Sequence, residues 1–431
     1  MILLLLGYMW LFIYRPFEIW PWLGTFRMEL VYFIGCSVFW LLMHQKNVLK
    51  NINVMAIMGI CASILISEVM TNNTGELNVT TEEWLKVLLF GLLLMTSLRD
   101  EKELKIIVAG FALIFFLYML HSYHEFRCGR HEYRMGIIRM IAINETLSDP
   151  NSFGYSIVFS LPLLTPLWSL TKEKKLLIAT RLFIVAYLAL AIICVRATGS
   201  RASMIGLLVY LAIAMMTSKH RLKIMVVAAI FGPILWFSLD TDMQNRYLTI
   251  IDPSRGPANA QSSAEGRIEG LKTGIWLLKQ SPVYGFGPGQ AQFHTPHKLQ
   301  THNLIGQVAG ELGGLGLLAY FVLCVSITVN FFASRLYWKV QVARNPASDP
   351  FMLLVSQAVL IGLFLLVLLG MGGHNAFRYT WIWFAVFQGY AVENLKSSIS
   401  AAIIKSDTRQ RSPNPARRKS LPTSPNVSQM Y

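Results

Sequence analysis

Two arginines close together in the chain mark a candidate anion site. The segment Arg196-Ala-Thr-Gly-Ser-Arg201 lies between two apolar stretches, so we expect a tight turn between two helices, with Ser200 capping the second. Arg201 then stands at a helix start, where free N–H groups and the helix dipole already favour negative charge. Two guanidinium groups this close repel each other unless an anion lies between them, so Arg196 and Arg201 predict a phosphate or carboxylate ligand.

A third arginine belongs to a candidate amphipathic helix over residues 265–279. Its apolar residues recur at helical spacing, at Ile268, Leu271, Ile275 and Leu278. This pattern predicts a short helix at a membrane surface. We expect Arg267 in its first turn, with Gly270 and Gly274 on the same face, where another backbone or a bulky ligand can approach closely. The arrangement suits a phosphate; the alternative is an anchor helix whose arginine is merely solvated.

His302 is the candidate base. Thr301 suits the cap of the apolar helix that follows, which would place His302 just outside the lipid, where a neutral imidazole can accept a hydroxyl proton. Asn303, Gln307 and Glu311 follow at i, i+4 and i+8 and form one polar stripe. At about 1.5 Å per residue, Glu311 would lie about 13 Å below His302. It is either a functional group within the membrane or a hydrogen-bonding partner in helix packing.

The sequence does not predict a metal or a cofactor. His294, His297 and His302 lack the i, i+4 spacing of a helical ligand pair, and no carboxylate or cysteine lies between them. Four of the five cysteines lie in apolar runs, so no disulfide framework is implied. Walker, Rossmann, HExxH and GxSxG motifs are missing from the sequence, so nucleotide hydrolysis and the common hydrolase chemistries have no support.

The elements that must position these residues are membrane helices. Of 431 residues, 54% are hydrophobic and 14% charged, whereas soluble domains carry roughly a quarter charged residues. Apolar stretches of about 20 residues, the length that crosses a bilayer, predict an all-α integral membrane protein with about twelve transmembrane helices. Their expected centres are Leu6, Phe33, Ile60, Phe90, Ile114, Ser160, Tyr187, Leu208, Ile230, Leu318, Leu363 and Phe384.

Lysine and arginine sort the connections between these helices into two sets. The lysine-rich set is cytoplasmic by the positive-inside rule, together with both termini. The arginine-rich set includes a long loop over residues 240–301, which we expect to be periplasmic and to contain short amphipathic helices. The formal net charge of +15 therefore points to an anionic substrate and to membrane lipid, with no nucleic-acid partner.

Three parts of the chain are expected from these patterns. Residues 1–140 form N-terminal transmembrane helices, and residues 141–396 form the membrane core that includes the outer loop 240–301. Residues 397–431 are polar, basic and rich in Ser and Pro, which predicts a disordered cytoplasmic tail.

Several short motifs occur in a fixed order between about residues 140 and 395. They are Asp149-Pro-Asn, Gly199-Ser-Arg201, Arg246-Tyr-Leu-Thr-Ile, Gly266-Arg267, Gly285-Phe-Gly-Pro-Gly289, and His302-Asn303 followed by Glu311-Leu-Gly-Gly-Leu-Gly316. This ordered set resembles the O-antigen ligase and polymerase superfamily of bacterial membrane glycosyltransferases. Arg196, His294, His297 and the region before about residue 120 have no counterpart that we can match.

The resemblance implies transfer of a glycan from a polyprenyl diphosphate carrier to a hydroxyl acceptor at the periplasmic face of the inner membrane, without nucleotide sugar or metal. It places Arg201 and Arg267 on the diphosphate and His302 on the acceptor hydroxyl. We also expect Arg196, Asn303 and Glu311 to bind substrate. The rival hypothesis is a multispanning transporter of a small anion or lipid-linked sugar, whose function would concentrate at Glu311.

Overall fold

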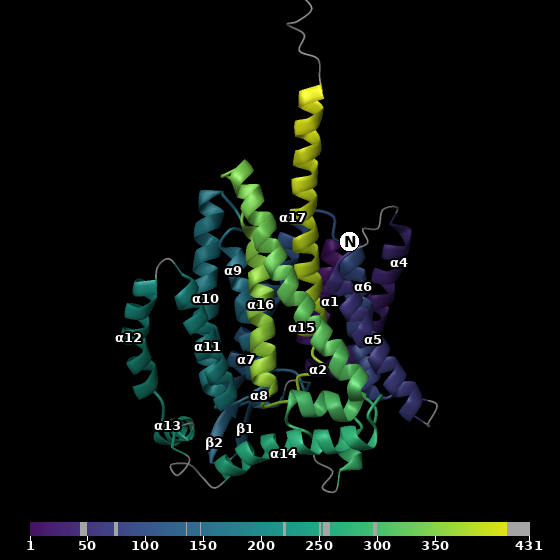
Figure 1. The fold of residues 1–431 in the computed structure, drawn as a ribbon. Coiled ribbons are helices and arrows are strands. Elements are labelled where there is room, and N and C mark those ends of the chain that lie inside the picture. Colours follow the sequence, from purple (N-terminus) through teal and green to yellow (C-terminus); the bar gives the residue numbers. More distant parts are fainter. Residues whose placement is uncertain are drawn as a thin grey trace, which may run out of the picture.

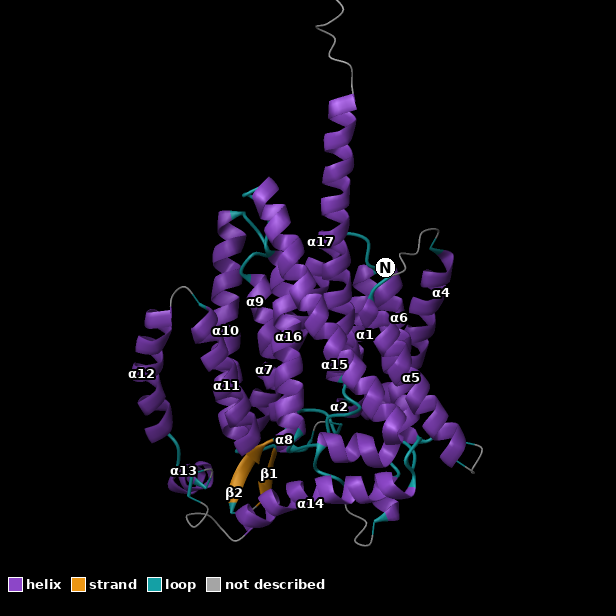
Figure 2. Ribbon diagram, in the orientation of Figure 1, coloured by secondary structure: helices purple, strands orange, loops and turns teal. Residues whose placement is uncertain are grey.

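The computed structural model of the chain is mostly helical, as Figure 2 shows. It describes residues 1–43, 50–72, 76–134, 136–146, 148–218, 221–249, 251–252, 259–295 and 300–411, without the side chains of residues 259–264 and 401–411. Long helices run side by side, and α14 (Asn259–Gln280) lies across one end of this bundle (Figure 1). At the same end, β1 (His131–Arg134) and β2 (Ile137–Met140) form an antiparallel hairpin.

The other helices have the following bounds. In chain order they are α1 (Ile2–Tyr14), α2 (Pro16–Ile19), α3 (Pro21–Gly24), α4 (Met28–Leu42), α5 (Ile52–Thr71), α6 (Val79–Ser97), α7 (Glu101–Arg127), α8 (Pro150–Ser160), η1 (Leu161–Leu163), α9 (Leu164–Leu167), α10 (Lys174–Thr198), α11 (Arg201–Thr217), α12 (Arg221–Phe237), α13 (Thr241–Leu248), η3 (Ala291–His294), α15 (Leu304–Arg344), α16 (Phe351–Gly370) and α17 (Thr380–Arg411).

The helices agree with an all-α membrane protein. All twelve expected centres fall within helices, namely α1, α4, α5, α6, α7, α8, α10, α11, α12, α15, α16 and α17. Within the described residues, six helices are long and apolar enough to cross a membrane, and the α12 and α13 pair, bent by 120°, would make a seventh. Twelve crossings stay a prediction, because α4 and α11 are short and α6 carries charged residues near its start.

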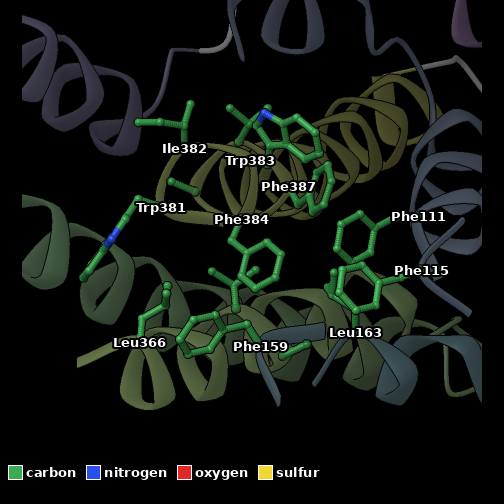
Figure 3. Packing of buried hydrophobic residues seen from close by; sticks show 14 of the residues in the cluster. Phe111, Phe115, Phe159, Leu163, Leu366, Trp381, Ile382, Trp383, Phe384 and Phe387 are labelled. Atoms are coloured by element: carbon green, nitrogen blue, oxygen red, sulfur yellow. The ribbon is translucent and has the colours of Figure 1, made fainter. Parts of the chain in front are cut away.

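Aromatic side chains fill the centre of the bundle. Phe384 of α17 faces Phe111 of α7 and Phe159 of α8 in Figure 3, and the Phe111 and Phe384 ring centroids are 6.2 Å apart. The ring of Trp383, also on α17, lies 5.0 Å from that of Phe90 on α6. Because lipid is as apolar as these rings, close packing, rather than transfer out of water, is what holds such helices together.

A break divides α15 shortly after its start. Gly313 has φ 65° and ψ −155°, a conformation that suits glycine alone. The N–H groups of Gly314 and Leu315 donate to the carbonyl oxygens of Pro282 and Val283 at 2.9 and 3.1 Å. Backbone groups freed by the break are therefore satisfied by the bend that precedes α15.

The segment before this break lies along α14 and not in line with the rest of α15 (Figure 1). Glycines make this approach possible, because a Cβ on Gly274 would lie 2.2 Å from the Cα of Gly306. The predicted depth of Glu311, about 13 Å below His302, assumed that this segment runs in the direction of the membrane span. Because the segment before the break lies along α14 instead, that depth does not follow.

Two element boundaries also differ from expectation. α14 begins at Asn259 and not near residue 265, so Arg267 lies well inside the helix and the predicted help from a helix start is lost. α17 continues to Arg411, so residues 397–411 are helical where a disordered tail was expected. No Gly or Pro interrupts this stretch before Pro413, which explains the extension; residues 412–431 lie outside the described part.

Candidate functional site

The turn between α10 and α11 has the predicted geometry. Gly199 adopts φ 58° and ends α10, and the Ser200 side chain accepts the N–H of Ser203 to cap α11. Arg201 is therefore the first residue of α11, and its Nη1 donates to Thr249 Oγ1 at 2.9 Å. The guanidinium stands where the free N–H groups of the helix start would also face an anion.

Arg267 reaches from α14 to the connection between α16 and α17. A Cβ added to Gly372 would lie 3.1 Å from the Cζ atom of Arg267, so the Arg267 guanidinium packs directly against this glycine. Arg267 is also close enough to Arg201 for the two positive charges to repel each other. The two arginines expected to share a ligand, though far apart in the chain, are thus brought near each other.

His302 lies beside a second histidine that sequence reasoning missed. The rings of His302 and His374 have centroids 4.2 Å apart, and the His374 side chain hydrogen-bonds to the Thr301 backbone. Although the side chain of His302 reaches the surface, desolvation by the surrounding chain lowers its pKa, with Arg267 and Arg134 acting in the same direction and Asp149 opposing them. Burial, together with His302, lowers the pKa of His374 to about 4.

The electrostatic neighbours of these residues define a larger group. We call it the arginine cluster: Arg134, Arg139, Arg201, Arg246, Arg267 and Arg378. Among the described residues, Asp149 and Glu132 are carboxylates that act on Arg139. The gathered guanidiniums place positive charge at one end of the bundle, which suits an anion of more than one negative charge.

Hydrogen bonds to the fold hold several of these arginines in place. Arg139 Nε donates to the Thr198 carbonyl at 2.8 Å, and Arg246 Nε donates to the Gly199 carbonyl at 2.7 Å. Arg378 Nη1 donates to Ser156 Oγ at 2.7 Å. Arginines fixed in this way are preorganised and need little rearrangement when an anion binds.

The family comparison bears on the segment that supplies most of this geometry. Residues 186–321 match the family model described as O-antigen ligase. This segment is similar to the O-antigen ligase family, and we call it the O-antigen ligase domain after the family model that it matches. It contains Arg201, Arg246, Arg267 and His302, and it is narrower than the range of about 140 to 395 over which the motifs were noted. No curated protein matches the chain.

Further residues come to the O-antigen ligase domain from outside its bounds. The hydroxyl of Tyr155, on α8, donates a hydrogen bond to the Gly372 carbonyl at 3.1 Å. The positive charges of Arg267 and Arg378 both act on Tyr155. Asp149 caps α8 by accepting the N–H of Ser152 at 2.8 Å. A His-Asn-Ala-Phe-Arg run over residues 374–378, polar at both ends and set between two apolar stretches, was the available signal for His374 and Arg378.

Arg196 contacts the end of α12. Its Nη2 donates to the Ser238 carbonyl at 2.9 Å, where α12 ends. Arg196 and Arg201, paired in the prediction by their spacing, therefore make different contacts. The binding role of Arg196 stays a prediction.

Asn303 and Glu311 are engaged in holding the fold. Asn303 Oδ1 accepts the N–H of Gly306 to cap α15, and its Nδ2 donates to the Met371 carbonyl at 3.3 Å. The carboxylate of Glu311 accepts the N–H of Gly289 at 2.8 Å, and its carbonyl accepts the Ser67 hydroxyl. Packing, the alternative interpretation of Glu311, accounts for these contacts, and substrate binding by either residue stays a prediction.

Of the three histidines considered for metal binding, His294 and His302 lie against different rings. The ring of His294 lies 4.5 Å from that of Phe286, and His297 lies outside the described residues. In the part of the chain that the structure describes, no three His, Cys, Asp or Glu side chains are placed to hold a metal ion.

Proposed function

We propose that this protein transfers or polymerises a glycan, moving it from a polyprenyl diphosphate carrier to a hydroxyl acceptor at the periplasmic face of the bacterial inner membrane. One observation carries the proposal: Arg267 acts electrostatically on both Arg201 and His302, so residues from three separate parts of the chain lie near one another at one end of the bundle. The O-antigen ligase domain supports the reaction class. The placement of lysines and arginines in the sequence supports the periplasmic side and cytoplasmic termini.

In the proposed reaction the acceptor oxygen attacks the anomeric carbon while the bond from that carbon to the phosphate oxygen breaks. The acceptor proton passes to His302, and the carrier diphosphate leaves with the bonding electron pair. Its negative charge rises as the bond breaks, so fixed guanidiniums at Arg201 and Arg267 stabilise the transition state more than the ground state. Attack from the side opposite the leaving group inverts the anomeric centre, and neither nucleotide sugar nor metal takes part.

The histidine pair suits the proton transfer. The lowered pKa of His302 keeps its ring neutral at neutral pH, so that it can accept a proton. His374, with a pKa of about 4, stays neutral as well and is held by the Thr301 backbone. We assign His374 as a positioning residue that fixes the orientation of the His302 ring.

Transfer assays with arginine variants test the proposal. Membranes that hold Arg201→Ala or Arg267→Ala should lose transfer of a carrier-linked oligosaccharide while retaining the inserted protein. The exposed Arg130→Ala variant is the matched control and should transfer normally. Undiminished product from both cluster variants would rule out the assignment.

The second candidate, transport of a small anion or lipid-linked sugar, has one supporting observation. The break at Gly313 and the 120° bend between α12 and α13 are interruptions of the kind found in transporters. Transport predicts that Glu311→Gln abolishes function while His302→Ala is harmless. Transfer predicts that His302→Ala is the damaging change.

A further inference from the structure

A cavity lies in the helices that precede the O-antigen ligase domain. Its volume is about 430 Å³, and α1, α4 and α6 contribute most of its lining. Aromatic rings of Tyr8, Phe17 and Phe33 line it together with the charged side chains of Glu29 and Lys86. A mostly apolar wall with a few converging polar groups is the usual composition of a small-molecule site.

The cavity lies at the end of the bundle that carries the arginine cluster. Lys86 is in the second turn of α6, and Asn78, which caps this helix, donates to the Pro288 carbonyl at 2.5 Å in the bend before α15. Trp84 of α6 packs edge-on against Phe377, three residues after His374, with ring centroids 6.2 Å apart. Contacts thus run from α6, in the cavity wall, to the connection before α15, which carries His302, and to the connection between α16 and α17, which carries His374.

Two buried polar atoms at the cavity are incompletely hydrogen-bonded. Among the described residues, neither the Tyr8 hydroxyl nor Glu29 Oε1 has a partner in good hydrogen-bonding geometry, although both atoms are buried and the two side chains lie close enough to act on each other. Burying such groups without a partner is costly, and the exceptions in folded proteins require an explanation such as a ligand. A carboxylate oxygen accepts hydrogen bonds and a phenol both donates and accepts them, so hydroxyl groups would satisfy both.

Charge argues for a neutral ligand. Glu29 faces the positive charges of Lys86 and Arg15, and Lys86 Nζ also lies 2.9 Å from Glu83. The charges around the cavity are therefore balanced within the fold, in contrast to the arginine cluster. Balanced charges, aromatic walls and incompletely hydrogen-bonded atoms together suit a neutral, hydroxyl-rich ring.

We propose that this cavity binds a saccharide unit of the substrate glycan, at a subsite separate from the arginine cluster. The inference rests on the proposed glycan transfer for the identity of the ligand. Carrier-linked donor and acceptor glycans present the same sugar chemistry, so either could supply the bound unit. The subsite lies on helices outside the O-antigen ligase domain, which suits a role in selecting the glycan.

Direct binding of free sugars tests the subsite without turnover. Saturation-transfer NMR with glucose, galactose, N-acetylglucosamine and lactose should show a bound saccharide on the purified chain. Tyr8→Phe and Glu29→Gln each remove one hydrogen-bonding function and should weaken binding about tenfold. Tyr337→Phe and Glu269→Gln, on other surfaces of the protein, are matched controls and should bind as the unaltered chain does. Should Tyr8→Phe fail to fold, Glu82→Gln at the exposed rim tests the same cavity.

Transfer kinetics then distinguish the two sources of the sugar. A raised apparent KM for the carrier-linked donor alone assigns the subsite to the donor, and a raised KM for the acceptor alone assigns it to the acceptor. Arg201→Ala should abolish transfer yet keep saccharide binding, so failure of the proposed function and failure of the subsite are separable. Equal saccharide binding by all variants would overturn the proposed subsite. So would native mass spectrometry that shows a phospholipid retained by the unaltered chain and released by Tyr8→Phe, because the cavity would then hold lipid.

Discussion

Two polar regions of this bundle solve the problem of buried polarity in opposite ways. The first, which we call the amide network, consists of Asn51, Asn53, Asn330 and Gln388 with Ser326 and Ser356. Asn53 Nδ2 donates to the Ala385 carbonyl at 2.9 Å and to Gln388 Oε1 at 3.1 Å, while its Oδ1 accepts from Asn330 and Ser326. Its members satisfy one another and hold α5, α15 and α17 together.

The arginine cluster is built from the same kind of fixed contacts but keeps an excess of like charge. Its members donate to carbonyl and hydroxyl oxygens of the fold, and several of their positive charges repel one another. Repulsion between Arg201 and Arg267 costs folding free energy that an anion would recover. From this difference we propose that the amide network serves stability and the arginine cluster serves binding, and each prediction below tests this division.

The largest effect is expected at His302. His302→Ala removes the proposed base and should lower the transfer rate by roughly 10²- to 10⁴-fold, with little change in thermal unfolding. For the unaltered chain, transfer should fall as the pH drops through the pKa of His302, because protonation removes the accepting nitrogen; the lowered pKa places this loss below the ordinary histidine range of about 6.5. Initial rates against pH, compared with His294→Ala as the control, measure both effects.

Removing charge from the arginine cluster should separate activity from stability. Arg201→Gln should reduce transfer by roughly 10²- to 10³-fold, as expected for one transition-state donor. Its melting temperature should stay equal or rise, because a repulsive charge is gone. Rates and unfolding curves on the same preparation measure this; a clear loss of stability would contradict the division.

The helix break supplies a purely structural test. Gly313→Ala adds a Cβ 2.6 Å from the Val283 carbonyl oxygen at a positive φ, and strain of this kind costs about 1–3 kcal/mol. Gly232→Ala in α12 meets nothing within 4 Å and serves as the control. Chemical or thermal unfolding in detergent should show a loss for Gly313→Ala alone.

A change in the amide network should lower the stability of the fold and leave the transfer rate nearly unchanged. Asn53→Ala leaves partners on α15 and α17 unsatisfied and should cost about 1–3 kcal/mol. Transfer per folded molecule should change less than about twofold, because among the described residues no hydrogen bond joins the network to the arginine cluster. Gln280→Ala, at the exposed end of α14, is the control for both measurements.

Local patterns predicted much of the fold. Apolar stretches located the helices because each helix in a membrane must satisfy its own backbone, so its signal is contained in its own residues. The Ser200 cap was predicted for the same reason, since the cap and the bonded N–H are neighbours in the chain. The break at Gly313 was not, because it depends on carbonyl oxygens of residues 282–283 that reach it only in the folded chain.

For the candidate site, too, features contained in local sequence were predicted and features that depend on distant contacts were not. Arg201, Arg267 and His302 were predicted because their residue types suit the chemistry and each stands near the start of an expected helix. His374, Tyr155 and Arg378 were missed as site residues, because their roles follow from contacts with distant elements. Arg196 is the opposite case. Its closeness to Arg201 in the chain suggested a shared ligand, but its side chain contacts the end of α12.

Arg196 gives the smallest expected effect and a sharp test of how far the arginine cluster extends. Its guanidinium donates to the Ser238 carbonyl in a solvent-exposed hydrogen bond. Arg196→Ala should therefore lower transfer less than about threefold, well below the loss expected for a transition-state donor. The comparison with Arg201→Ala is closely matched, because the two arginines flank one turn. Steady-state rates at saturating donor measure it. A loss of transfer at Arg196 as large as that at Arg201 would mean that both guanidiniums bind the anion. The hydrogen bond from Arg196 to the Ser238 carbonyl would then break when substrate binds.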